Sequence, residues 1–160
     1  MTQEIQLSDY GGNYEAFCDA CYQAYLAFWA GKPTFEGKKI QRNANKVSRG
    51  KEDDFWGIVD GHDASKDHEI ERYCKVPLLG HVLSPENVKA ASDVLFIRRL
   101  HKRKIRIEVF SRSKSYLVVL QELGKLDRVQ FITAYPLGEG QLRKKLKNYE
   151  EFKRNGFEPL

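Results

Sequence analysis

Residues 128–147 read RVQFITAYPLGEGQLRKKLK, and this stretch indicates how the chain folds. The apolar, β-branched run up to Tyr135 predicts a strand, the Pro and Gly residues after it predict a turn, and the basic run that follows predicts a helix. Strand ends that lead into loops often present functional side chains. Here Thr133 and Tyr135 precede a group of cations, namely Arg143, Lys144, Lys145 and Lys147. Hydroxyls beside cations suit phosphate chemistry.

Strand patterns also fill the region upstream of this stretch. Alternating apolar residues predict strands over 94–101, 104–110 and 116–123, with a fourth over 129–135. Short links such as Lys102-Arg103 join them, so an antiparallel meander is expected. Apolar residues at spacings of three and four predict a helix over 13–30 and another over about 140–154. The sequence therefore predicts an α+β fold, with an N-terminal helix and a C-terminal helix packed on a four-stranded antiparallel sheet.

The segment between these parts carries weaker signals. Residues 38–46 and 54–59 have some strand character, 60–67 reads as a loop, and Ser84-Pro85 predicts the start of a short helix over 86–92. A length of 160 residues favours a single domain. We expect a helical part over about 12–82 and the sheet with the basic helix over about 84–154.

Charge is spread unevenly along the chain, although the net charge is only +5. The acids concentrate in the first part of the sequence, and Glu108 alone opposes a dense basic run. A concentrated basic face is typical of a protein that binds a polyanion. A solvated charged surface is the alternative interpretation. The cations of this run are Arg98, Arg99, Lys102, Arg103, Lys104, Arg106, Arg112 and Lys114.

The cysteines and the apolar runs indicate in which compartment the protein is expected and whether it binds a metal. Cys18, Cys21 and Cys74 make an odd count, and no apolar run approaches the ~20 residues that cross a bilayer. The first residues lack the features of a signal peptide. We therefore expect a reduced, cytoplasmic protein without membrane contact. Cys18 and Cys21 fall in the apolar stripe of the first helix, which favours core packing over a metal site. We expect no metal and no cofactor.

Common catalytic motifs are absent, since the sequence has no P-loop, dinucleotide-binding turn or hydrolase elbow. Each histidine is a possible general base, because imidazole titrates near neutral pH, although an ordinary surface role is the more common one. Cations around His101 would depress its pKa and leave it neutral. The histidines are His62, His68, His81 and His101.

A set of hydroxyl and cationic residues matches the needs of RNA cleavage. Such cleavage without a metal requires a base near the ribose 2′-hydroxyl, cations on the phosphate and an acid at the leaving oxygen. A groove that only binds the RNA backbone would use the same residue types, so both interpretations stay open. The set comprises Tyr116, Thr133 and Tyr135 with Arg72, Lys75, Arg106, Arg143 and Lys144.

Several motifs together resemble the phage-associated branch of the barnase, EndoU, colicin E5/D and RelE-like (BECR) nucleases. They are Tyr116-Leu-Val-Val-Leu120, Phe131-Ile-Thr-Ala-Tyr-Pro136, Arg143-Lys-Lys with Tyr149-Glu-Glu-Phe152, Gly31-Lys-Pro-Thr-Phe35, Asp54-Phe-Trp56, and Glu71-Arg72 followed by Lys75. The resemblance extends from about residue 14 to 154. It implies a metal-independent ribonuclease that acts as a toxin on tRNA or mRNA, with an antitoxin or immunity protein as a possible partner.

The resemblance also implies roles for individual residues. Thr133 would contact a phosphate or hydroxyl, Arg72 and Lys75 would be cationic site residues, and Tyr116 and Tyr135 would frame the site or transfer protons. Gly57 stands where these nucleases usually have a His, which leaves the acid or base role to His62, His81 or a Lys. Of these we include His81 among the candidate catalytic residues. RNA-binding roles are expected for Arg98, Lys102, Lys104, Arg106, Arg143, Lys144 and Lys147.

Three functions are therefore considered. The first is a small toxin-type endoribonuclease, the second is an RNA-binding module without turnover, and the third is an interaction protein whose basic face meets an acidic partner.

Overall fold

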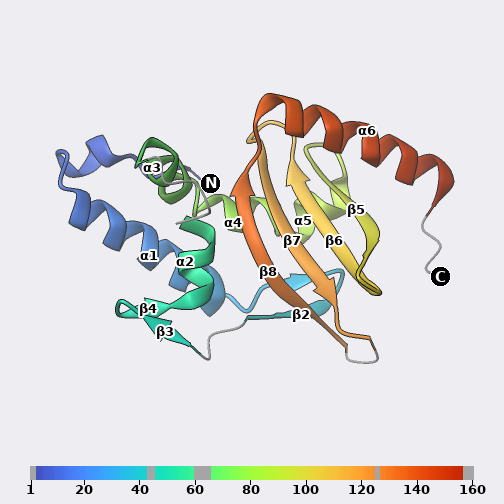
Figure 1. The fold of residues 1–160 in the computed structure, drawn as a ribbon, viewed down its shortest axis with the longest axis horizontal. Coiled ribbons are helices and arrows are strands. Elements are labelled where there is room, and N and C mark those ends of the chain that lie inside the picture. Colours follow the sequence, from blue (N-terminus) through green and yellow to red (C-terminus); the bar gives the residue numbers. More distant parts are fainter. Residues whose placement is uncertain (1–2, 43–45, 60–65, 125–126, 157–160) are drawn as a thin grey trace.

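The computed structural model describes residues 3–42, 46–59, 66–124 and 127–156, with the side chains of 66–69 left out of that description. Within these residues the chain forms an α+β structure in which helices lie against a curled, mixed sheet (Figure 1). The α+β prediction is confirmed. No helix in the described ranges is long and apolar enough to cross a membrane.

The main sheet has six strands in the order β1-β2-β8-β7-β6-β5. The four predicted strands are present as antiparallel neighbours, but the prediction of a four-stranded, purely antiparallel sheet is wrong. β2 pairs with β8 in parallel, and β1 pairs with β2. The strand signal over 38–46 is confirmed for β2, but nothing local in the sequence indicates a parallel partner almost ninety residues away. The strands are β1 (Thr34–Phe35), β2 (Lys38–Gln41), β5 (Val94–His101), β6 (Lys104–Ser111), β7 (Tyr116–Glu122) and β8 (Arg128–Pro136).

The first side of the sheet is covered by helices and holds the larger core. Phe17, Cys21 and Tyr25 of the first helix pack into one cluster with sheet residues such as Val118 and Phe131. A short 3-10 helix and a small hairpin flank this layer. These elements are η1 (Leu7–Tyr10), α1 (Tyr14–Ala30), β3 (Val47–Ser48), β4 (Lys51–Glu52), α2 (Asp53–Val59), α3 (Lys66–Cys74), α4 (Leu78–Val82) and α5 (Pro85–Ala90).

Two parts of this layer differ from the sequence-based prediction. Residues 54–59 form helix α2 rather than a strand, because Asp53 and Asp54 suit the start of a helix and Phe55, Ile58 and Val59 recur at helical spacing on its buried side. Helices α3 and α4 were not predicted. Residues 66 and 67 of the expected loop belong to α3, whereas 60–65 lie outside the described residues.

The cysteines of α1 pack as the sequence predicts. Cys21 is buried and Cys18 half-buried, and both contribute to the core. Burial, with smaller contributions from Cys74 and Cys18, raises the pKa of the Cys21 thiol to about 12. This is opposite to the shift that activates a thiolate. Among the described residues, no cluster of His, Cys, Asp and Glu is arranged to hold a metal ion.

Helix α6 (Glu139–Asn155) lies against the second side of the sheet. Its residues Leu142, Leu146 and Tyr149 pack on a smaller apolar cluster that includes Phe110 and Leu117. Figure 1 shows α6 running across one end of the strands. The second side therefore has an apolar end beneath α6, and toward the other end of the strands the residues that share this side are polar.

Candidate functional site

A row of polar side chains crosses the second side of the sheet at right angles to the strands. The strand registers pair Gln41 with Gln130, Gln130 with Gln121, Gln121 with Arg106, and Arg106 with Arg99. We call these five residues the polar row. Four strand spacings span about 19 Å. The row is therefore long enough to lie along several nucleotides of an extended chain.

Hydrogen bonds link neighbours within the polar row. Gln41 Nε2 donates to Gln130 Oε1 at 3.5 Å, and Arg106 Nε donates to Gln121 Oε1 at 2.9 Å. Arg128, which lies on the same side of β8, donates from Nη1 to Gln41 Oε1 at 3.2 Å. The amides are thus held in fixed orientations, with cations at both ends of the row.

The basic end of the row places two arginines side by side. Arg99 and Arg106 are direct cross-strand partners, and like charges in this position oppose each other. Arg106 donates to a neutral amide, and no carboxylate within the described residues pairs with it. The side chain of Arg99 is 54% exposed. This part of the sheet is therefore an electrostatically favourable place for an anion.

A buried carboxylate holds Arg99 from the α6 side. Glu108 Oε2 lies 3.1 Å from Arg99 Nε, and Glu108 Oε1 accepts from Lys145 Nζ at 2.7 Å. The Glu108 side chain is only 3% exposed, so both of its oxygens depend on these cations. Lys145 comes from α6, and this contact ties the helix to the polar end of the sheet. Glu108 thus positions two cations next to the row.

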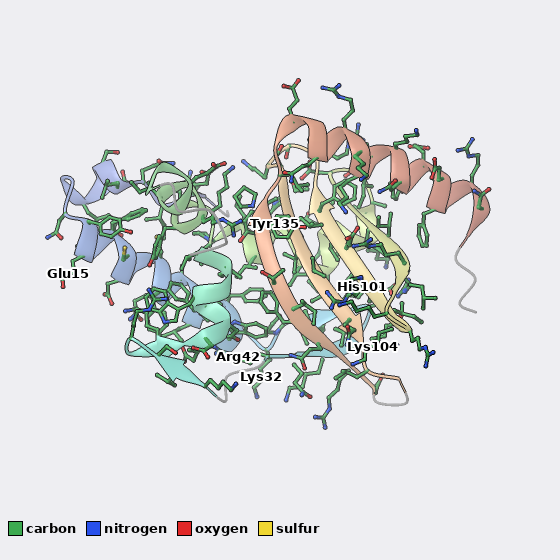
Figure 2. All side chains as sticks on the ribbon, in the orientation of Figure 1. Glu15, Lys32, Arg42, His101, Lys104 and Tyr135 are labelled. Carbon is green, nitrogen blue, oxygen red and sulfur yellow. The ribbon has the colours of Figure 1, made fainter. Side chains whose placement is uncertain are left out.

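Two hydroxyl residues of β8 border the row on the same side. A register irregularity in the β7–β8 ladder lies where Phe131 pairs with Leu120 and Thr133 pairs with Val119. The extra residue, Ile132, keeps Thr133 and Tyr135 on the side that carries α6. Both Thr133 and Tyr135 are partly exposed. Tyr135, labelled on β8 in Figure 2, packs against the same small apolar cluster as Leu142 and Leu146 of α6.

Burial and three nearby charged side chains shift the pKa of Tyr135. Burial raises the pKa of the Tyr135 phenol and Glu108 adds to the rise, while Arg99 and Arg72 oppose it. The phenol therefore stays protonated at neutral pH and is available as a proton donor. Arg72 of α3 donates from Nη1 to the backbone carbonyl of Ile58 in α2 at 3.4 Å, on the helix-covered side.

The opposite side of the row carries His101 and Lys104, which are cross-strand partners (Figure 2). Burial, Arg106, Lys102 and Arg99 all lower the pKa of His101, which agrees with the sequence-based expectation. His101 is therefore neutral at pH 7 and able to accept a proton.

The link between β5 and β6 is unusual. Lys102 and Arg103 both have positive φ, 48° and 67°. Such turns normally use Asn and Gly, and each larger side chain strains the backbone. The turn thus places two cations at the tip of the hairpin, next to His101.

The structure brings part of the predicted site together. Thr133, Tyr135, Lys104 and Arg106 share the second side of the sheet, and Lys102 lies at the adjoining turn. Arg72 is near enough to influence Tyr135. Three predicted RNA-binding residues instead lie on the exposed surface of α6, where Arg143 forms an ion pair with Glu139 at 3.8 Å: they are Arg143, Lys144 and Lys147.

Other predicted residues lie elsewhere. Tyr116 is fully buried in the core of the first side, with no partner for its hydroxyl among the described residues, so it has no route to exchange a proton with RNA. Arg98 points to the first side and pairs with Glu122 at 3.0 Å and with Glu36. Lys75 lies 4.0 Å from Glu4.

His81 is also separate from the row. Its Nε2 lies 2.9 Å from Asp93 Oδ2, and Asn87 Nδ2 lies 3.4 Å from its Nδ1. Both ring nitrogens are therefore engaged on the helix-covered side, in a cluster that fastens α4 to the start of β5. His62 and the side chain of His68 lie outside the described residues.

Gly57 is exposed on α2, and a Cβ there would meet nothing within 4 Å. Helix α2 packs on the first side of the sheet, because Phe55 and Ile58 belong to the larger core. A side chain at position 57 would therefore stand on the helix-covered side, away from the polar row.

Sequence reasoning missed Arg99, Glu108, Lys145, Gln121 and His101 as members of one site. The sequence did contain a pattern that places Glu108 and Arg106 on one side of the sheet. The two-residue link at 102–103 sets the register of β5 against β6, and alternation along β6 then puts Glu108 and Arg106 on one side. The docking of α6, which supplies Lys145, had no comparable signal.

Comparisons with family models, with curated proteins and with solved structures found no match to this chain.

Proposed function

We propose that the chain is a small endoribonuclease that needs no metal and cleaves RNA by attack of a 2′-hydroxyl on the adjacent phosphate. The observation that carries the proposal is the opposed pair Arg99 and Arg106, with a neutral histidine on one side and a protonated phenol on the other. Cleavage in line requires the base and the acid on opposite sides of the phosphate. On the strand registers His101 adjoins the arginine pair, and Tyr135 lies on β8, two strands and four residues from Arg106. We assign the base role to His101 and the acid role to Tyr135.

We assign a residue to each step. The phosphate binds between Arg99 and Arg106, which also stabilise the charge that grows on its oxygens. His101 accepts the proton of the 2′-hydroxyl as the oxygen attacks phosphorus. The bond from phosphorus to the 5′-oxygen breaks, and Tyr135 donates a proton to that oxygen. The products are a 2′,3′-cyclic phosphate and a free 5′-hydroxyl.

Neighbouring residues support these steps. Glu108 holds Arg99 and Lys145 in position. The hydroxyl of Thr133 and the amide of Gln121 are additional donors along the RNA backbone.

The resemblance to the BECR nucleases supports the biological setting within this proposal. It favours a phage-associated toxin of the cytoplasm that acts on tRNA or mRNA. An antitoxin or immunity protein with an acidic surface would complement the cations of the polar row and its neighbours.

The test is incubation of the purified protein with total tRNA and with mRNA in EDTA, followed by analysis of the fragment ends. Discrete fragments with 2′,3′-cyclic phosphate ends are expected. His101→Gln should remove at least ~99% of the cleavage, since general acid–base groups contribute about 10²–10⁴-fold. Thr133→Ala should lower it, and Thr133→Val separates loss of the hydroxyl from loss of packing. Arg112→Gln, on the exposed link after β6, is the matched surface control.

Intact RNA at high protein excess would contradict cleavage. Salt-dependent binding of the same RNA without products would then identify an RNA-binding module on the same surface.

A further inference from the structure

Beside the polar row, strands β6 and β7 separate. Their ladder runs from the pair Ser111 and Tyr116 to the pair Arg106 and Gln121, where it ends. Beyond that point β6 continues with β5 alone, and β7 continues with β8. A cavity of about 390 Å³ lies in this opening. It is lined by Arg103, Lys104, Ile105, Gln121, Glu122, Leu123 and Gly124.

The walls of the cavity combine two kinds of surface. Ile105 and Leu123 supply apolar side chains, while Arg103, Lys104 and Gln121 supply donors. The one acid of the lining, Glu122, accepts from Arg98 Nε at 3.0 Å and is thereby neutralised. The volume falls in the range of small-molecule sites, about 300–1,000 Å³. This volume and this mixture of apolar and polar lining suit a nucleobase, which has apolar faces and polar edges.

The cavity also has a fixed relation to the proposed cleavage site. Gln121 belongs both to its lining and to the polar row, where it binds Arg106. A phosphate on Arg99 and Arg106 would therefore leave the next nucleotide at the mouth of the cavity.

We infer that the opening between β6 and β7 binds an unstacked nucleobase, so that the protein takes single-stranded rather than duplex RNA. This inference rests on the proposed function, because it assumes that RNA lies along the polar row. Bases within a duplex are stacked and paired, and they do not enter such a cavity without being extruded.

The test measures binding without cleavage. The probe is a fluorescein-labelled 2′-O-methyl dodecaribonucleotide, which keeps the bases but lacks the attacking hydroxyl, either alone or annealed to its complement. Fluorescence anisotropy at constant salt gives both dissociation constants. A duplex carries the higher charge density, so charge alone would favour it. We expect the single strand to bind about tenfold more tightly.

A matched pair of truncations assigns the preference to the cavity. Leu123→Ala should weaken single-strand binding about fivefold, the equivalent of about one buried methylene group, without changing duplex binding. Leu100→Ala removes an equal side chain that is 46% exposed and does not line the cavity, and it should change neither constant. With the wild-type protein, a strand with abasic sugars should bind at least as weakly as the normal strand binds to Leu123→Ala.

Equal binding of both RNA forms, or an abasic strand that binds as well as the normal one, would overturn the inference and leave the proposed function standing. Absence of binding to either form would overturn both.

Discussion

Arg99 and Arg106 face each other across β5 and β6, although like charges in this position destabilise a sheet by roughly 0.2–1 kcal/mol. Only one of them is joined to a carboxylate within the described residues, since Glu108 binds Arg99 and Arg106 binds the amide of Gln121. The arrangement therefore gives up stability at a place where an anion would restore it.

Arg106→Gln should have opposite effects on the free energy of unfolding and on RNA affinity. Loss of the opposed charge should leave the free energy of unfolding unchanged or raise it by about 0.5 kcal/mol, whereas RNA affinity should fall. The slope of log K against log salt should shrink by about 1, as for one lost phosphate contact. Urea denaturation and anisotropy titrations measure the two effects. Arg112→Gln serves as control, and a variant that loses stability and keeps its salt slope would contradict the assignment.

Lys145 and Lys144 are neighbours in sequence with different expected roles. Lys145→Met leaves the buried Glu108 with Arg99 alone and should cost about 1–3 kcal/mol of unfolding free energy. Lys144 is exposed, so Lys144→Met should change the free energy by less than about 0.5 kcal/mol. Urea denaturation compares them. If both substitutions changed the free energy of unfolding equally, the contact between Lys145 and Glu108 would not contribute to stability.

Cleavage should follow the protonation of His101. Burial and the nearby cations lower its pKa in the free protein, and a base must be deprotonated to act, so the acidic limb of kcat/KM should lie below the value of about 6.5 for a free imidazole. A bound phosphate offsets those cations, and the limb of kcat should therefore lie at higher pH. Rate profiles between pH 4 and 8 test both limbs. If the acidic limbs of the kcat/KM and kcat profiles lay at the same pH, this would argue against His101 as the base.

The strained turn after β5 offers a substitution that raises stability. Asn and Gly at positions 102 and 103 suit the left-handed backbone there, so Lys102→Asn with Arg103→Gly should stabilise the fold by about 1 kcal/mol. The same change removes two cations and should weaken RNA binding at low salt more than at high salt. Thermal denaturation and anisotropy are the measurements. A double variant of unchanged melting temperature would mean that the turn is not strained.

Asp93 should make the fold sensitive to acid. Burial acts to raise its pKa, but hydrogen bonds from Ser111, His81 and Ser113 outweigh burial and hold the pKa well below its usual range. A lowered folded-state pKa means that the stabilisation is complete above the unfolded pKa of about 3.9 and is lost as pH falls below it. Unfolding free energies from pH 6 down to 2 should therefore decline more steeply for the wild type than for Asp93→Asn. Parallel curves would contradict this role.

Local patterns sufficed for the elements that make contacts close in sequence. Alternating apolar residues and short links predicted β5 to β8, and Ser84-Pro85 predicted the start of α5. Each of these patterns depends on only a few adjacent residues. Local reasoning marked a strand over 38–46 but failed for the pairing of β2, whose Ile40 gains its burial from a partner on β8. It also failed for residues 54–59, where the apolar spacing fits a helix better than a strand.

The candidate site shows a similar division. Thr133, Tyr135 and Arg106 were predicted from residue type and placement at strands, and the structure puts them on one side of the sheet. Counting cations also selected Arg98, Arg143, Lys144 and Lys147, since composition does not say on which side a residue lies. Strand register distinguishes Arg98 from Arg99, and only the docking of α6 brings Lys145 to Glu108.

The parallel pairing of β2 with β8 has a consequence for the order of folding. Gln41 meets Gln130, so the polar row is complete only after a segment of almost ninety residues has closed into a loop. Glu108 gains its contact with Lys145 only after α6 has been synthesised. During synthesis the first half of the chain leaves the ribosome well before either partner exists. A nascent chain therefore lacks the finished polar row and the Glu108–Lys145 contact, which is made only once α6 has emerged.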